Sequence, residues 1–380
     1  MERQKSNFKS RHSYFLSLAF EQAKINLGST SKNPSVGCVI ERDGSIISSG
    51  HTSLNGRPHA EYNALNKRKN FKNANLYVTL EPCSHSRKNG SCTQAIIKAG
   101  VGRVVAAIRD VDPRVNGQGF AKLTASGIKV NVGLMASEAA RDHAGFISRV
   151  RNECPYISLK LAQSFDGRTA ISSGESKWIT NQASRRLVHL LRSRSDAVMV
   201  GGGTARKDNP ALTVRGIGVK HDTVRIVISG PLDIPKTSQF LSTAKENPLW
   251  LCHSKAASLD RKKYWEDRGA QLFLCESNEG FIDLKDVFRK LALKGLTRVF
   301  CEGGSTLASS LIKLDLVDEL IGFNAGILIG SEGSPSIGEL GIKKLADAPK
   351  FNLYSSGQVG SDILNIWLRE NQNDDFLLDF

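Results

Sequence analysis

The sequence has 380 residues, of which 40% are hydrophobic and 23% charged, a composition typical of a soluble globular protein with room for two domains. It contains no run of about 18 apolar residues and no apolar core behind its polar N-terminus, so we expect neither a membrane span nor a secretory signal. The net charge of +15 comes from scattered Lys and Arg with few aromatics, which does not favour a nucleic-acid surface. Seven irregularly spaced cysteines predict free thiols in a reducing compartment, and hence a cytoplasmic protein.

Helical and strand patterns alternate in the first part of the chain, which predicts an α/β layered architecture. A glycine-bearing turn at 42–44 indicates a hairpin between two of the strands. The expected helices are 13–26, 59–69, 92–99 and 120–126, and the expected strands are 36–40, 45–51, 75–80, 103–108 and 129–132.

The alternation restarts near Cys154-Pro155, so we expect one domain over 1–150 and a second over 151–380. Glycine-rich turns follow two strands of the second domain, at 201–204 and 303–306. Such turns let backbone N–H groups approach a phosphate. Neither turn matches G-x-G-x-x-G, so a Rossmann fingerprint is absent. The expected strands are 156–162, 197–201, 224–229, 248–253, 271–275, 298–302, 319–325 and 363–368, with helices 180–193, 284–294 and 305–313.

The most informative motif is His59-Ala60-Glu61 followed by Pro82-Cys83 and then Cys92. One histidine and two thiolates form a three-ligand zinc set, and the open fourth position is the mark of a catalytic zinc, which can activate water near neutral pH. Glu61 is not needed as a ligand and is placed to carry protons to a leaving amine. This is the arrangement of zinc-dependent nucleobase deaminases.

The gap between the two cysteines departs from the usual two residues, because eight residues, 84–91, separate them. The longer loop argues against a plain cytidine deaminase. His85, inside this loop, is a candidate fourth ligand that would close the site and make the zinc structural. The presence of Glu61 beside the set favours the catalytic alternative.

Polar residues of the second domain gather in sequence around the first glycine-rich turn. A pair of arginines can clamp a phosphate bidentately. Lysine is costly to bury, so we expect the lysine that follows the apolar strand 156–159 to face a polar cleft. The residues are Lys160, Ser176, Trp178, Arg192, Asp208 and Arg215.

Several segments of both domains, in the right order over roughly residues 13–370, resemble the bifunctional riboflavin-biosynthesis deaminase–reductase family. In the first domain they are NPSVGCVI (33–40), PHAEYNAL (58–65), YVTLEPCSH (77–85) and AIIKAGVGRVV (95–105). In the second they are SLKLAQSFDGRTA (158–170), SGESKWIT (173–180), LLRSRSDAVMVGGGTARKDNPALTVR (190–215), CEGGSTLASSLI (301–312) and LVDEL (316–320).

The resemblance implies a cytidine-deaminase-like three-layer domain followed by a dihydrofolate-reductase-like domain. It implies hydrolytic deamination of 2,5-diamino-6-ribosylamino-4(3H)-pyrimidinone 5′-phosphate with Zn²⁺, and NADPH-dependent reduction of the ribosyl side chain. It further implies a homo-oligomer, a small phosphorylated pyrimidine as substrate, and no nucleic-acid or membrane partner.

The resemblance also assigns site residues. It implies zinc ligands at His59, Cys83 and Cys92, with Glu61 as the proton shuttle. It implies pyrimidine or phosphate contacts at Asn33, His51 and Lys88. The implied cofactor positions are Lys160, Ala162, Trp178, Thr204, Asp208, Gly304, Ser305, Thr306 and Leu307, and the implied substrate positions of the reductase are Ser176, Arg192, Leu212, Arg215 and Glu302. Asp208 is in addition our candidate for handling protons during the reduction, a role that we hold as a hypothesis.

Three departures from the family pattern stand out. The loop SRKNGSCT (86–93) lacks the two prolines that the family often has there. Asn209 and Ser229 stand where the family often has aspartates, and Ser229 bears on cofactor affinity. Two other functions stay open from the sequence: a tRNA-editing adenosine deaminase, which the net charge favours, and a chain whose reductase half serves only as a binding or scaffold module.

Overall fold

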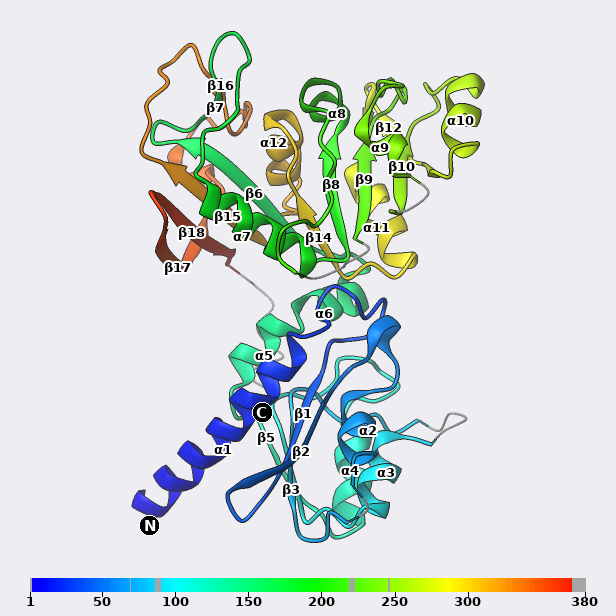
Figure 1. The fold of residues 1–380 in the computed structure, drawn as a ribbon, viewed down its shortest axis with the longest axis vertical. Coiled ribbons are helices and arrows are strands. Elements are labelled where there is room, and N and C mark those ends of the chain that lie inside the picture. The colour runs from blue at the N-terminus through cyan, green and yellow to red at the C-terminus, as the bar shows by residue number, and fades with distance from the viewer. Residues whose placement is uncertain (1, 69, 86–89, 219–222, 245–246, 371–380) are drawn as a thin grey trace. The chain divides into compact units, whose positions relative to one another are not determined.

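The computed structural model describes residues 2–68, 70–85, 90–218, 223–244 and 247–370. The chain divides between Glu153 and Cys154 into two compact units, coloured blue to cyan-green and green to red in Figure 1. Each unit has an apolar core of its own. Within the described residues, no helix combines the length and the apolar character needed to cross a membrane.

A single mixed sheet forms the centre of the first unit. Its described strands are β1 (Gly37–Arg42), β2 (Ser45–His51), β3 (Asn75–Val78), β4 (Arg103–Ala106) and β5 (Lys129–Val132). They are ordered β2-β1-β3-β4-β5, with β1 antiparallel to both neighbours and β3, β4 and β5 parallel. The fully buried Ile40, Leu76 and Val104 come from three adjacent strands and form the middle of the core.

Helices cover both faces of this sheet, so the first unit has three layers (Figure 1). A Cβ atom at Gly37 would lie 1.8 Å from the Ala19 carbonyl oxygen, and one at Gly50 would lie 2.4 Å from that of Ala60. Gly50 pairs with Cys38, and neighbouring residues such as Gly37 and Cys38 face opposite sides of a sheet. The helix that contains Ala19 therefore contacts one face of the sheet, and the helix that contains Ala60 contacts the other. The helices are α1 (Glu2–Ala23), η1 (Leu54–Gly56), α2 (Ala60–Leu65), α3 (Cys92–Lys98), α4 (Gln118–Ala125), α5 (Ala136–Asp142) and α6 (Ala144–Asn152).

The second unit contains a larger sheet with the described order β11-β10-β9-β8-β14-β6-β15-β18-β17. All neighbours from β11 to β15 are parallel, and β15-β18-β17 are antiparallel. The bounds are β6 (Tyr156–Ser164), β8 (Ala197–Gly201), β9 (Val224–Ile228), β10 (Leu249–His253), β11 (Gln271–Leu274), β14 (Arg298–Cys301), β15 (Glu319–Ala325), β17 (Phe351–Val359) and β18 (Asp362–Arg369). Two short pairs are β7 (Arg168–Ala170) with β16 (Ser334–Pro335), and β12 (Ser277–Asn278) with β13 (Phe281–Ile282).

The adjacent parallel strands β8, β14 and β6 end at the same edge of this sheet, where α/β sheets form ligand clefts. The Asn181 side chain accepts a hydrogen bond from the Ser184 N–H and so caps α7. The helices are α7 (Gln182–Ser193), α8 (Gly202–Asp208), α9 (Gln239–Ser242), α10 (Leu259–Glu266), α11 (Leu284–Leu293), α12 (Ser305–Lys313) and η2 (Leu345–Asp347).

The predicted α/β architecture is confirmed, but several element predictions were wrong in their extent. The helix predicted over 59–69 ends at Leu65, because Leu65 is the last residue of the segment that is buried. Within the turn predicted at 201–204, Gly201 ends β8 and the next three residues instead start α8, although Gly202 and Gly203 are glycines. The chain also has α5, α6, α10 and β17, which the sequence patterns did not indicate.

We expect Gly50→Ala to displace α2 and lower the stability of the first unit by about 1–3 kcal/mol, because the added methyl group would meet the Ala60 carbonyl and the Ala64 N–H. Denaturant unfolding with parallel measurement of bound zinc checks this, since α2 follows directly from His59. Gly357→Ala is the matched control, with nothing within 4 Å of its Cβ position. Equal effects of the two substitutions would contradict the packing argument.

Candidate active sites

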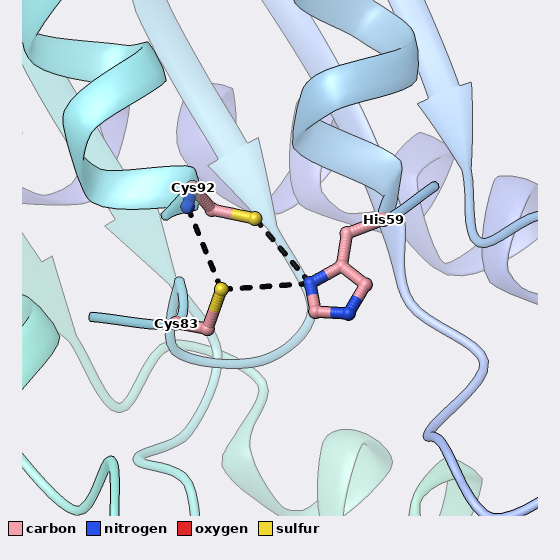
Figure 2. A group of neighbouring side chains, drawn as sticks. All are labelled: His59, Cys83 and Cys92. Carbon is pink, nitrogen blue, oxygen red and sulfur yellow. Dashed lines mark hydrogen bonds between the residues drawn. The ribbon is translucent and has the colours of Figure 1, made fainter. Parts of the chain in front are cut away.

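Three side chains of the first unit come together to form a candidate metal centre (Figure 2). The ligand atoms of His59, Cys83 and Cys92 all lie within 4.8 Å of one another. The Nδ1 atom of His59 is 3.6 Å from the Cys83 sulfur and 3.4 Å from the Cys92 sulfur. An imidazole and two thiols facing a common point are the donor set that zinc prefers, so the residues fit this metal.

Local structure fixes the direction of each ligand. His59 is the N-cap residue of α2, and its side chain makes no capping hydrogen bond, which leaves the ring to face the two sulfurs. Cys83 follows β3 along the chain. Cys92 is the first residue of α3, which starts with a capping box in which Ser91 and Gln94 bond each other's backbone N–H.

The electrostatics of the cluster favour metal binding. The hydrogen bond with Cys92 is the main cause that lowers the pKa of Cys83, to about 4, so this residue is a thiolate at neutral pH. The same hydrogen bond, with burial, raises the pKa of Cys92. Burial lowers the pKa of His59, but Cys83 and Glu61 outweigh it and the net shift is upward. Burial raises the pKa of Glu61 to about 7, a value suited to accepting and returning protons near neutral pH.

A cavity of about 300 Å³ opens onto the metal cluster. Glu81 shapes one wall, because its carboxylate accepts hydrogen bonds from the backbone N–H groups of Asp110, Gly117, Gly119 and Phe120 at 2.8–3.3 Å. The cavity is lined by Lys32, Asn33, Pro34, Val36, Thr52, Arg57, His59, Glu61, Leu80, Glu81, Cys83, His85, Asp110, Asp112, Arg114, Val115, Phe146 and Arg149.

The structure brings only part of the predicted deaminase set to this cavity. Asn33 lies in its wall, whereas His51, at the end of β2, is not among the lining residues. Lys88 lies outside the described residues. His85 lines the cavity but is not part of the ligand group, and neither of its buried ring nitrogens has a hydrogen-bond partner among the described residues.

A second cavity, of about 430 Å³, lies at the carboxyl-terminal edge of β6, β8 and β14. It contains ten of the predicted reductase positions. They are Lys160, Ala162, Ser176, Thr204, Asp208, Glu302, Gly304, Ser305, Thr306 and Leu307.

Lys160 and Glu302 line this cleft, and Arg192 pairs with Glu302 from outside the lining. The Arg192 guanidinium donates to both Glu302 carboxylate oxygens, at 2.5 and 3.0 Å, and to the Thr213 carbonyl at 2.8 Å. Burial raises the pKa of Glu302, but the charges of Arg192 and Lys160 outweigh it and the net shift is downward. Burial lowers the pKa of Lys160, and the Glu302 charge opposes that shift. Lys160 therefore does face a polar cleft, with a carboxylate beside it.

Four predicted reductase positions lie away from the cleft wall. Trp178 is 69% exposed, with the Arg185 guanidinium 4.4 Å from its ring centroid. Leu212 is buried in an apolar cluster. The Arg215 backbone N–H donates to His189 Nδ1, and the Arg192 guanidinium pairs with Glu302.

The turn between β14 and α12 fits the phosphates of a dinucleotide. Gly304 is the N-cap of α12 without a side-chain cap, so the N–H groups of the first turn have no intrahelical partner. A Cβ at Gly303 would lie 2.6 Å from the Leu307 side chain, and one at Gly304 would lie 3.0 Å from Thr204 Oγ1. Glycine is therefore needed at both positions because the turn packs closely against Leu307 and Thr204.

Comparison with protein-family models agrees with the two sites. Residues 9–108 match the cytidine and deoxycytidylate deaminase zinc-binding region, and residues 155–365 match the RibD C-terminal domain. The class defined by fold and site is therefore a zinc-binding deaminase joined to a reductase.

Individual relatives define the family. The riboflavin biosynthesis protein RibD of Escherichia coli is 38% identical over 92% of this chain and 97% of its own length, and that of Aquifex aeolicus is 36% identical over 93% and 98%. A structure of Acinetobacter baumannii RibD matches 96% of this chain and 100% of its own at a TM-score of 0.85 and 32% identity. The deaminase/reductase of Thermotoga maritima matches 95% and 99% at 0.84 and 30%.

The chain belongs to the RibD family of riboflavin biosynthesis proteins. It is a bifunctional enzyme that uses Zn²⁺ to deaminate 2,5-diamino-6-ribosylamino-4(3H)-pyrimidinone 5′-phosphate and NADPH to reduce the ribosyl side chain, giving 5-amino-6-ribitylaminouracil 5′-phosphate. The predicted family, fold class, activities and cofactors are thereby confirmed.

Sequence reasoning missed several residues of the deaminase cavity. Glu81 belongs to the motif YVTLEPCSH, which does not indicate that its carboxylate anchors the segment 110–119. Asp110 and Asp112 stand in a polar loop whose Asp-x-Asp spacing was the available signal. Burial raises the pKa of Asp110 to about 7. Arg57 and Arg149 gave no local signal, because only the fold brings them to the cavity.

Alkylation of the zinc-free full-length protein tests the electrostatics of the cluster. Because the pKa of Cys83 is lowered to about 4, its thiolate persists as the pH falls from about 8 to about 5, and its labelling rate should change little. An ordinary thiol, with a pKa of about 8.5, loses roughly tenfold in rate per pH unit over that range. Mass spectrometry of iodoacetamide-treated protein gives the rate at each cysteine.

Cys154 is the internal control, since burial raises its pKa to about 12 and its labelling should be slow. Cys92→Ala removes the main hydrogen bond and should shift the labelling of Cys83 to higher pH. A tenfold loss of Cys83 labelling per pH unit in the unsubstituted protein would contradict the account.

Proposed function

We propose that residues 1–150 carry the deaminase and residues 151–380 the reductase, with separate active sites. The observation that supports this assignment most directly is the convergence of His59, Cys83 and Cys92 beside Glu61 in the first unit. The three ligands hold zinc and leave one position open. When bound, the metal supplies a Lewis acid that activates water at that position.

The protein groups of the deaminase then handle protons and orientation. The Glu61 carboxylate, which lines the cavity, takes a proton from the attacking water and later delivers it to the departing amine. Its burial, with a pKa near 7, suits both halves of this transfer. Asn33, His51 and Lys88 are proposed as pyrimidine or phosphate contacts.

In the reductase, NADPH supplies the hydride and the protein orients the two reactants. Cofactor binding is assigned to nine of the predicted positions in and around the cleft, and substrate binding to five more. Lys160 and Glu302 lie beside each other at the base of the cleft, which supports placing cofactor and substrate together there. The cofactor positions are Lys160, Ala162, Trp178, Thr204, Asp208, Gly304, Ser305, Thr306 and Leu307, and the substrate positions are Ser176, Arg192, Leu212, Arg215 and Glu302.

We further propose a cytoplasmic homo-oligomer that binds neither nucleic acid nor membrane. All seven cysteines are free thiols, which supports a reducing compartment. The strands β17 and β18 expose Leu353, Tyr354, Ile363 and Trp367, at 37–53%, on the edge of the reductase sheet, which supports association through that half.

Glu61→Gln separates the two activities. Without the carboxylate, we expect ammonia release from the diaminopyrimidine ribosyl phosphate to fall by at least about 10²-fold, the usual contribution of a positioned acid–base group. NADPH oxidation on the deaminated intermediate should not change. Ammonia release and NADPH absorbance measured on the same preparations check this, and unchanged ammonia release would refute the role of Glu61.

Asp208→Asn tests the hypothesis that this residue handles a proton in the reduction. Asp208 ends α8 and lines the cleft. We expect NADPH oxidation to fall by about 10²-fold or more, while ammonia release continues. Lys313→Gln, on the last turn of α12 and outside the cleft, is the charge-changing control. Reductase turnover equal to that of the unsubstituted enzyme would rule out the proposed role.

A further inference from the structure

The segment 210–215 of the reductase unit carries two proposed substrate positions, Leu212 and Arg215, and belongs to no helix or strand. Within the described part of the chain, its backbone forms no hydrogen bond with another backbone group. Leu212 has a φ of +53°, in the left-handed region that a bulky residue adopts only where its surroundings hold it there. The conformation of this segment therefore depends on the packing of Leu212 and on side chains that bond to its backbone.

Two side chains of α7 supply such bonds. The Nδ1 atom of His189 accepts a hydrogen bond from the Arg215 backbone N–H at 3.2 Å. Arg192, three residues later and on the same face of the helix, donates to the Thr213 carbonyl at 2.8 Å. The same guanidinium holds the Glu302 carboxylate, which lines the reductase cleft. One face of α7 thus ties the segment 210–215 to a charged group of the cleft.

The bond to His189 depends on the protonation state of the imidazole. A protonated ring has two N–H donors, so its Nδ1 atom would face the Arg215 N–H as donor against donor. The charged groups that act on the ring are Arg192 of α7, Arg215 of the segment and Glu302 after β14. Burial and then the two arginines lower the pKa of His189, although Glu302 and a hydrogen bond with the Thr213 backbone oppose that shift. The imidazole is therefore predominantly neutral at about pH 7 and becomes charged only in more acidic solution.

We propose that neutral His189 is a positioning residue of the reductase, which holds the segment 210–215 in the conformation that binds the substrate, and that protonation of its ring releases the segment. His189 does not line the cleft and acts through the Arg215 backbone. The affinity of the reductase for the deaminated ribosyl phosphate consequently falls as the solution becomes acidic. The inference rests on the proposed assignment of Leu212 and Arg215 to substrate binding and adds a pH dependence to it.

The test measures NADPH oxidation by the full-length enzyme at varied concentrations of the deaminated ribosyl phosphate. His189→Ala removes the acceptor and should raise the KM for this substrate about 3-fold to 10-fold at about pH 8, the loss expected for one hydrogen bond, with little change in kcat. His189→Asn keeps an uncharged acceptor near the position of Nδ1 and should recover most of the affinity.

A pH profile separates the imidazole from other titrating groups. The phosphate of the substrate has a second pKa of about 6, and its titration affects every variant alike. As the pH falls from about 8 to about 5.5, the KM of the unsubstituted enzyme should therefore rise at least about 2-fold more than that of His189→Asn. The inference is wrong if the two KM values rise in parallel, or if His189→Ala has the KM of the unsubstituted enzyme at about pH 8.

Controls separate this inference from misfolding and from the proposed function. Arg186→Gln removes an exposed charge from the same helix, outside the cleft lining, and should leave KM and kcat unchanged. An unchanged Kd for NADPH, measured by fluorescence, shows that the reductase unit of each variant is folded. A loss of NADPH affinity as large as the loss of substrate affinity would instead show a general loss of structure and overturn the inference. If the unsubstituted enzyme oxidises no NADPH with the deaminated compound, the reductase assignment itself fails.

Discussion

The geometry of the deaminase depends on bringing one imidazole and two thiols from three separate segments within 4.8 Å of one another. The β1–β2 hairpin carries α2 and its N-cap His59, β3 leads to Cys83, and the capping box of α3 fixes Cys92. Zinc needs deprotonated ligands, and the hydrogen bond from Cys92 lowers the pKa of Cys83 for that purpose. Glu61 lies in the first turn of α2 and His59 is the N-cap of that helix, so one short element positions both the proposed metal ligand and the proposed proton shuttle.

In both sites, the groups that face the cavity stand at the ends of helices or strands of the α/β layers. In the reductase unit, the glycine turn before α12 presents backbone N–H groups, and the side chains of Lys160 and Glu302 come from β6 and the end of β14. Arg192 offsets the cost of burying the Glu302 carboxylate through a bidentate pair. The family's two activities thus draw on separate units, each with its own core.

The sequence motifs were sufficient to predict that His59, Cys83 and Cys92 come together, as well as the α/β class and most strands, because these depend on local pattern and on residue types with specific chemistry. They could not predict that Glu81 anchors the loop 110–119, because that contact spans about thirty residues and depends on how β3 and β4 pair. Helix α8 differs from its local propensity, since the two glycines in its first turn disfavour a helix that tertiary packing nevertheless stabilises. The approach of Arg57 and Arg149 to the deaminase cavity likewise exists only in the folded chain.

X-ray absorption at the zinc edge of the purified enzyme tests the central claim most directly, because it counts the ligands of the metal. A three-ligand site with an open position predicts two sulfurs at about 2.3 Å, one imidazole nitrogen at about 2.0–2.1 Å and one further light atom from water. The imidazole signal should correspond to a single ring, and His85→Ala should leave the spectrum unchanged. Two imidazoles in the enzyme, one of which is lost in His85→Ala, would show a closed structural site and contradict the account.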